Sequence, residues 1–270
     1  MKRVRIVRHR RGTPARPALD QVAGEEPLEI RVDSRPIAVV MRTPGHDEEL
    51  ALGFLVSEGL IRNREDVRTV RPNVRNRSGN SIDVLLAPEV QVDFQRLTRH
   101  VFASSSCGLC GSASIAAVRR QYPALTRPLP TPDPERLLGL PEAMRLAQTE
   151  FSRTGGLHAA SWFRMDGSLQ AVREDVGRHN AVDKLLGWAL REGSLPLREL
   201  GLLVSGRVSF EIVQKALAGG VGVIAAVSAP TSLAVEFARR NGQTLVGFLR
   251  DGRFNVYSGK VRAGKLRAES

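Results

Sequence analysis

The sequence predicts a mixed α/β protein, α+β overall, in which a small N-terminal α+β domain precedes an α/β sandwich domain. The main observation is a pair of short apolar runs, residues 202–204 and 223–227, that alternate with helix-like stretches. Such runs are typical of strands that are covered on both faces. Two turn signals between alternating apolar residues, Asp33-Ser34 and Asp166-Gly167, predict hairpins. Five prolines in residues 123–134 predict an extended connector between the two parts.

The elements of the first half follow from alternation and from helix-start chemistry. Alternating apolar residues on both sides of the first turn predict a hairpin over residues 28–39. Thr43-Pro44 predicts the start of a helix, because an N-cap residue is followed by a proline in the first turn. Apolar residues between positions 50 and 60 mark one face of this helix, which we expect to end near Gly59. Residues 81–87 predict a further strand.

The second half alternates strands and helices and has a hairpin at each end. The first hairpin pairs residues 157–165 with 169–174, and the last turns about Asp251-Gly252. The other predicted elements are a helix at 180–192, a strand at 200–205, a helix at 209–218, a strand at 221–228, a helix at 231–240, and strands at 244–250 and 253–258. This order predicts an α/β sandwich.

The net charge of +12 is concentrated at the two ends of the chain. Residues 1–20 have a net charge of +6 and residues 260–270 a net charge of +3, which leaves +3 for the 239 residues between them. A nucleic-acid-binding protein usually has a basic face on its folded body, so we expect no nucleic-acid partner. We expect residues 1–20 to be a disordered basic tail, residues 21–132 the N-terminal domain, and residues 133–270 the C-terminal domain.

Composition predicts a soluble globular protein. Hydrophobic residues make up 42% of the chain, which is enough to build a core, and no apolar run approaches the roughly 20 residues of a membrane span. The first twenty residues have no apolar stretch, so we expect no signal peptide. These features predict a cytoplasmic protein without a membrane partner.

The two cysteines of the chain form a single C-x-x-C motif, Cys107 and Cys110, within a loop rich in serine and glycine. Structural cysteines usually lie among apolar residues, so this setting favours a chemical role. Three chemistries fit the motif: disulfide exchange, half of a zinc site shared by two subunits, and transport of sulfur as a persulfide. All three need a thiolate, which the start of a predicted helix at residues 112–120 favours. The spacing alone does not choose among them.

Three loops follow predicted strands and lead into predicted helices, at residues 173–180, 205–209 and 228–232. Helix N-termini bind phosphates, and ligands of open α/β sheets gather at the carboxyl ends of strands. Ser205 and Arg207 of the second loop are therefore candidate phosphate contacts, and Arg178 is a further source of charge. The alternative is that Ser209 and Thr231 only cap helices and the arginines are solvated. Of the histidines, His179 is the better functional candidate by position, since His158 also fits a core histidine.

With these residues in view, the chain resembles the formate dehydrogenase accessory sulfurtransferase family (FdhD) from about Asp20 to Tyr257. The motifs shared with the family are Ala51-Leu52-Gly53-Phe54 with Ser57-Glu58-Gly59, the Cys107–Gly111 loop, Glu174-Asp175-Val176-Gly177-Arg178-His179, and Leu245-Val246-Gly247-Phe248. The resemblance implies a cytidine-deaminase-like C-terminal domain and a homodimer.

The resemblance also implies the activity. Members of the family take sulfur from a cysteine desulfurase and transfer it to the molybdenum bis(molybdopterin guanine dinucleotide) cofactor of formate dehydrogenase. Cys107 would hold the persulfide, with Cys110 assisting, and the formate dehydrogenase apoenzyme would be the client. The cofactor-contacting segment would be Phe248, Leu249, Arg250, Asp251, Gly252 and Arg253.

Other functions predict different features. Zinc deaminases require H-x-E and P-C-x-x-C motifs, but Ser106 replaces the proline and Ala160 the glutamate after His158, so we expect no catalytic zinc. A chaperone that only delivers the cofactor would not need Cys107. A dithiol oxidoreductase would need Cys110 as much as Cys107.

Overall fold

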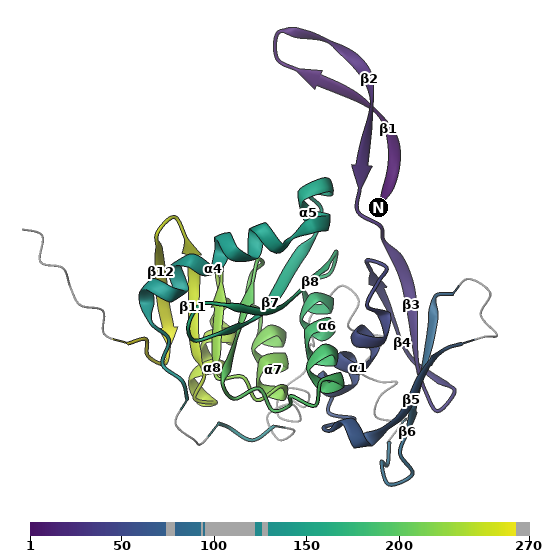
Figure 1. Cartoon of the computed structure of the whole chain (residues 1–270), viewed down its shortest axis with the longest axis vertical. Coiled ribbons are helices and arrows are strands. Elements are labelled where there is room, and N and C mark those ends of the chain that lie inside the picture. The colour runs from purple at the N-terminus through teal and green to yellow at the C-terminus, as the bar shows by residue number, and fades with distance from the viewer. Residues whose placement is uncertain (74–78, 93, 95–121, 126–128, 263–270) are drawn as a thin grey trace, which may run out of the picture.

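The computed structural model describes residues 1–73, 79–92, 94, 122–125 and 129–262. The described strands form three sheets, of two, four and six strands (Figure 1). The mixed α/β class predicted from the sequence is confirmed. No helix in the described part of the chain is long and apolar enough to cross a membrane.

The N-terminal residues form a hairpin, so the expectation of a disordered tail is wrong. Strand β1 (Lys2–Arg10) pairs antiparallel with β2 (Thr13–Val22), and Gly12 adopts a φ of 76° between them. Both Pro14 and Pro17 lie on β2, an edge strand, where a missing N–H is tolerated.

The four-stranded sheet contains the first predicted hairpin. Its strands, in spatial order, are β4 (Arg35–Arg42), β3 (Glu26–Val32), β6 (Ser81–Leu86) and β5 (Val67–Pro72), and the short helix η1 (Arg64–Asp66) precedes β5. Asp33 and Ser34 both have positive φ angles, 46° and 66°, as the predicted tight turn requires. The Asp83 carboxylate fixes the turn by accepting hydrogen bonds from the backbone N–H and the hydroxyl of Ser34.

Helix α1 (Asp47–Ser57) begins later than the predicted start at Thr43-Pro44. Thr43 instead joins the two halves of the chain: its N–H donates to Asp175, and its hydroxyl accepts from the N–H of Val176. All residues of α1 from Glu49 onward are buried, because the helix lies between the four-stranded sheet and a helix of the second half. A helix covered on all sides gives an almost continuous apolar run rather than one apolar stripe.

The six-stranded sheet contains the six strands predicted for the second half. Its spatial order is β12 (Arg253–Ser258), β11 (Thr244–Arg250), β10 (Val223–Ala226), β9 (Leu200–Val204), β7 (His158–Arg164) and β8 (Leu169–Asp175). Strands β9, β10 and β11 are parallel, and the predicted hairpins β7–β8 and β11–β12 are antiparallel.

Helices cover both faces of this sheet. The helices α6 (Arg178–Arg191), α7 (Phe210–Ala218) and α8 (Ser232–Arg240) pack on one face, together with apolar residues such as Trp162 and Leu202. Helix α4 (Pro134–Ala147), followed by α5 (Thr149–Thr154), covers the other face, where Phe163 and Leu203 lie. Successive strand residues therefore point into two different cores, as the apolar runs predicted. The sequence analysis did not predict α4 or α5.

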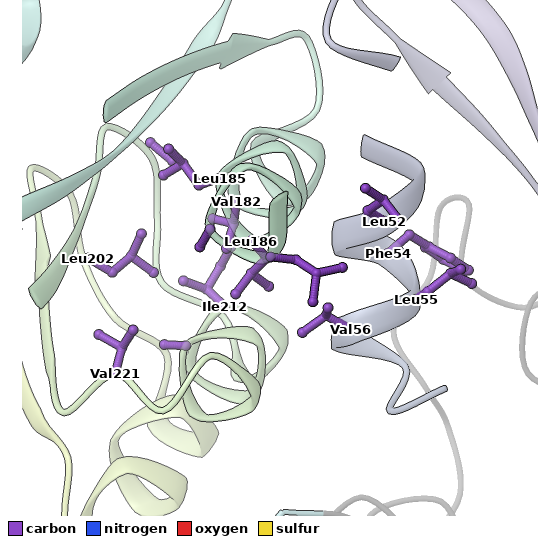
Figure 2. Packing of buried hydrophobic residues seen from close by; sticks show 14 of the residues in the cluster. Leu52, Phe54, Leu55, Val56, Val182, Leu185, Leu186, Leu202, Ile212 and Val221 are labelled. Carbon is purple, nitrogen blue, oxygen red and sulfur yellow. The ribbon is translucent and has the colours of Figure 1, made fainter. Parts of the chain in front are cut away.

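One hydrophobic cluster extends from the four-stranded sheet through α1 to α6 and α7 (Figure 2). Helices α1 and α6 touch through glycines: a Cβ on Gly53 would overlap the carbonyl of Asp183, and one on Gly187 would overlap the carbonyl of Glu49. The two halves therefore share a core at this contact. The division into domains at residue 132, and the likeness of the second half to cytidine deaminases, stay predictions.

Candidate functional site

The three predicted loops meet at one edge of the six-stranded sheet. Strand β7 is antiparallel to both β8 and β9, so β8, β9, β10 and β11 all end at this edge. The N–H of Val208 in the second loop donates to the carbonyl of Ala229 in the third at 3.1 Å. The N–H of Phe248 donates to the carbonyl of Ser228 at 3.1 Å, which brings the end of β11 beside the third loop. The convergence predicted from the strand–loop–helix order is confirmed.

Ser205 and Arg207 lie at this edge in different settings. The Ser205 hydroxyl accepts a hydrogen bond from the N–H of Ala159 at 2.9 Å, and its own N–H donates to the Ala159 carbonyl at 3.0 Å. Ser205 thus fixes the start of β7 against the end of β9. Arg207 is exposed and, among the described residues, has no carboxylate partner. Its guanidinium is available to a ligand.

The predicted cofactor segment forms the end of β11 and the turn into β12. Phe248 has a φ of 53°, and the Arg250 guanidinium lies over its ring at 5.6 Å. Asp251 and Gly252 form the turn, and Arg253 pairs with Arg250 across it. Leu249 is fully buried in the core. Its side chain supports the sheet, so it can offer a ligand only its backbone.

His158, Gly206 and Arg178 pack together where the loops meet. A Cβ on Gly206 would lie 3.3 Å from Nδ1 of His158 and 3.5 Å from Cδ of Arg178, so glycine permits this close approach. The Nε of Arg178 is buried and has no hydrogen-bond partner in the described part of the chain. A buried donor without a partner is unfavourable and rare in proteins, which indicates a missing acceptor at this point.

The charge around this cluster is positive. Burial lowers the pKa of His158, and the neighbouring positive charges of Arg178, His179 and Arg207 lower it further. A lowered pKa keeps the His158 ring neutral at pH 7, so the two guanidinium groups supply the charge for an anion. Backbone N–H groups at the helix N-termini add to the same potential.

The alternative that these loops only cap helices holds for Thr231 but not for Ser209. The Thr231 hydroxyl accepts from the N–H of Ala234 at 3.3 Å and is the N-cap of α8. The Ser209 hydroxyl makes no such bond and instead lies 3.1 Å from Nε2 of His179, which also lies 3.0 Å from the Glu211 carboxylate. The hydrogen bond from His179 lowers the pKa of Glu211, against the effect of burial. Sequence analysis singled out His179 and missed Glu211, whose position in the first turn of a helix is common for acidic residues.

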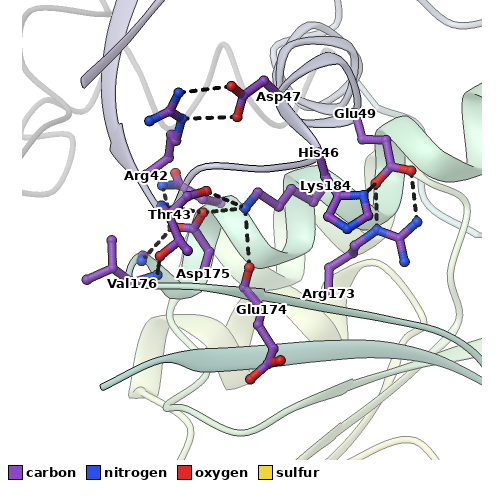
Figure 3. A network of polar contacts seen from close by, with 12 residues as sticks. Arg42, Thr43, His46, Asp47, Glu49, Arg173, Glu174, Asp175, Val176 and Lys184 are labelled. Carbon is purple, nitrogen blue, oxygen red and sulfur yellow. Dashed lines mark hydrogen bonds and ion pairs between the residues drawn. The ribbon is translucent and has the colours of Figure 1, made fainter. Parts of the chain in front are cut away.

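A buried polar network holds the first loop in place (Figure 3). Asp175 and Lys184 form an ion pair at 2.7 Å, with side chains 0% and 1% exposed. The Lys184 ammonium also donates to the carbonyls of Thr43 and Glu174 at 2.9 and 3.2 Å. The Asp175 carboxylate accepts from the N–H of Gly177 at 2.8 Å, directly before Arg178. The position of the Arg178 side chain therefore depends on this pair.

Cys107 and Cys110 lie outside the described residues. The chain is described again from Tyr122, whose hydroxyl donates to the carbonyls of Val56 and Ser57 at 2.6 and 3.2 Å. The Ser57 hydroxyl in turn accepts from the Lys215 ammonium at 2.9 Å, and Lys215 lies one helical turn beyond Glu211 on α7. Tyr122 is therefore connected through Ser57, by two hydrogen bonds, to α7, the helix that contains Glu211.

Comparisons with known proteins place this architecture in a family. The chain matches the sequence model of the FdhD/NarQ family over residues 23–263, and it belongs to that family. It is 50% identical over 275 residues to a protein of Streptomyces coelicolor named sulfur carrier protein FdhD, with 99% of this chain and 96% of the relative covered. A protein of the same name from Mycobacterium tuberculosis is 49% identical, with 94% and 95% covered.

A solved structure confirms the fold. It is assigned to a formate dehydrogenase accessory protein from Desulfotalea psychrophila and aligns with a TM-score of 0.72. The alignment covers 96% of each chain at 24% identity.

Proposed function

We propose that this protein is a sulfur carrier in formate dehydrogenase maturation. It takes sulfur from a cysteine desulfurase on Cys107 and transfers it to the molybdenum bis(molybdopterin guanine dinucleotide) cofactor, which is the substrate. The two relatives described above, both named sulfur carrier proteins, support this function, as does the C-x-x-C motif. The observation that carries the proposal is the buried Arg178 Nε without a partner among the three loop ends, where an anionic group of the cofactor would supply the acceptor.

The loading step is a thiol–persulfide exchange. The Cys107 thiolate attacks the outer sulfur of the donor persulfide, a new S–S bond forms, and the donor leaves as a thiolate. In the delivery step the outer sulfur becomes a ligand of molybdenum and Cys107 leaves as a thiolate. The electron pair that reduces this sulfur comes from the metal, which is oxidised from Mo(IV) to Mo(VI). Cys110 assists by protonating or resolving the persulfide.

The cofactor is held by its guanosine diphosphate ends. Arg178, Arg207, Arg253 and the helix N-termini would meet the diphosphate, and the Phe248 ring would lie on the nucleoside side. The Asp251 carboxylate can accept from the N1 and N2 donors of guanine, which adenine does not present in that arrangement. The protein acts as a homodimer in this proposal, because a two-fold assembly matches a ligand with two similar ends.

Incubation with a cysteine desulfurase and cysteine should add one reducible sulfur, about 32 Da, to each chain, and Cys107→Ala should abolish this addition. The reason is that Cys107 opens the one dithiol motif of the sequence. Intact-mass spectrometry before and after reduction measures the addition. Cys110→Ala is the matched control and should still gain the sulfur. Near-normal rescue of formate dehydrogenase by Cys107→Ala would favour the chaperone instead.

GDP should bind at the end of the six-stranded sheet, and Arg207→Ala and Arg253→Ala should each weaken binding about ten-fold or more, because each removes a charge-assisted phosphate contact. ADP should bind more weakly by ~1–3 kcal/mol, because its base leaves Asp251 unpaired. Calorimetry measures both effects. Arg198→Ala is the control, since Arg198 is exposed just before β9, at the opposite edge of the sheet. Equal affinity for GDP and ADP, or equal losses in all three variants, would place the site elsewhere.

A further inference from the structure

The hairpin β1–β2 forms a sheet of its own and projects from the body of the protein (Figure 1). It lies before the residues that match the family model. Residues 1–22 contain seven Lys and Arg residues and one acidic residue, and all seven basic side chains are exposed. Lys2 and Arg8 have distant carboxylate partners, at 3.7 and 3.8 Å. The described residues offer no carboxylate to the other five, Arg3, Arg5, Arg10, Arg11 and Arg16.

One face of the hairpin combines this charge with exposed apolar side chains. Cross-strand partners lie on the same face, and successive residues alternate between faces. The register pairs Arg5 with Leu19, so Arg3, Arg5, Val7 and Leu19 share one side, which we call the docking face. Val7 and Leu19 are 62% and 64% exposed. A two-stranded ribbon is marginally stable alone, so an apolar and basic face of this kind favours a bound partner.

Two further features fit an extended, acidic occupant. A cavity of about 420 Å³ at the base of the hairpin is lined by Met1, Lys2, Arg3, Gln21 and Arg153. Three of these side chains are cationic, so the cavity would accept carboxylates. The outer edge of β1 contains no proline, whereas β2 contains two, so an added strand would find its hydrogen-bonding groups on β1.

We infer that the docking face binds an extended acidic segment of a partner protein, and that this partner is the apoenzyme that receives the cofactor. The inference rests on the proposed function. Nucleic acid would satisfy the arginines, but its phosphate backbone would leave Val7 and Leu19 without apolar contacts. A protein segment with alternating acidic and apolar residues satisfies both.

The position of the hairpin selects the apoenzyme over the sulfur donor. A Cβ on Gly156 would lie 3.5 Å from Cβ of Ala23, so the base of the hairpin lies beside the residues that lead into β7, whose first residue, His158, belongs to the candidate site. The described residues on either side of the cysteine segment lie away from the hairpin. Phe94 stacks under Arg35, at the end of β4 away from the hairpin, and Tyr122 binds the last turn of α1. A partner that binds the docking face would therefore lie on the side of the candidate nucleotide site.

The test measures binding of purified apo-formate dehydrogenase to the full-length protein and its variants by calorimetry. The double variants Arg3→Glu/Arg5→Glu and Val7→Ser/Leu19→Ser should each weaken binding at least about ten-fold, because charge reversal and loss of apolar contact both act at this face. The matched control is Arg8→Glu/Arg16→Glu, which changes the charge equally on the opposite face and should weaken binding less than about three-fold. Loading of Cys107 from inorganic polysulfide, which needs no docked protein, should be unchanged in all three.

Four other outcomes would overturn the inference. Absence of binding by the unmodified protein, or equal losses in both charge-reversal variants, would exclude a specific face. Conversion of a dimer to a monomer in the docking-face variants would assign the face to a second copy. Loss of oligonucleotide binding with unchanged apoenzyme binding would assign it to nucleic acid. Failure of Cys107 to load from any donor, with face-specific binding intact, would contradict the proposed function and leave the docking face standing.

Discussion

Gly53→Ala or Gly187→Ala should destabilise the protein by about 4 kcal/mol or more, a loss comparable with much of the total stability of a typical domain. Each new Cβ would overlap a backbone carbonyl of the facing helix, of Asp183 or Glu49. A backbone atom cannot move aside by changing rotamer, so α1 and α6 would have to separate. These helices join the two sheets, and their separation would open the shared core. Urea unfolding followed by circular dichroism measures the loss.

Gly139→Ala is the control for this prediction. Gly139 lies inside α4, and apart from its neighbours in that helix no described atom lies within 4 Å of the position that its Cβ would take. Alanine has the higher helix propensity, so this variant should gain up to about 1 kcal/mol. If Gly53→Ala unfolds at the same urea concentration as the unmodified protein, the close contact of α1 with α6 is incorrect.

Lys184→Met should cost about 3–5 kcal/mol of stability, because it leaves the Asp175 carboxylate buried without its counter-ion. Both side chains are at most 1% exposed, and the ammonium makes two further hydrogen bonds to backbone carbonyls. The same change should weaken GDP binding, since Asp175 positions the loop that leads to Arg178. Thermal unfolding and calorimetry measure the two effects on one preparation.

Lys260→Met is the matched control, because Lys260 is exposed after the last strand and should tolerate the same substitution. A double-mutant cycle with Asp175→Asn tests the coupling directly. Additive losses in the cycle would show that the two groups do not interact.

The sequence predicted the second half of the fold well because its signals are local. The runs at 202–204 and 223–227 lie in β9 and the β10 region, and the turns at Asp166-Gly167 and Asp251-Gly252 close the two hairpins. It also predicted that the strand-to-helix loops would converge, since parallel strands end at one edge. It did not predict α4, because this helix contains Gly139 and Pro141, and both residue types are unfavourable inside helices.

The candidate site was only partly visible in the sequence. Ser205, Arg207 and the segment from Phe248 follow predicted strands, so their common edge could be inferred. Glu211 and Lys184 could not be assigned partners, because each pairs with a residue from a different element, His179 or Asp175, and no sequence pattern fixes such a contact.

The sequence by itself determined the fold class, the family motifs and the cysteine pair, because these depend on residue type, spacing and periodicity. Only the tertiary structure decided which groups lack partners and which are enclosed. The basic N-terminal residues have the composition of a disordered tail but form a hairpin, because the antiparallel pairing of β1 with β2 joins backbone groups whatever the side-chain charge. Arg178 and Arg207 look alike in sequence, yet one has a buried Nε without a partner and the other is exposed. Burial and partnership are properties of packing between distant segments, and a linear pattern does not contain them.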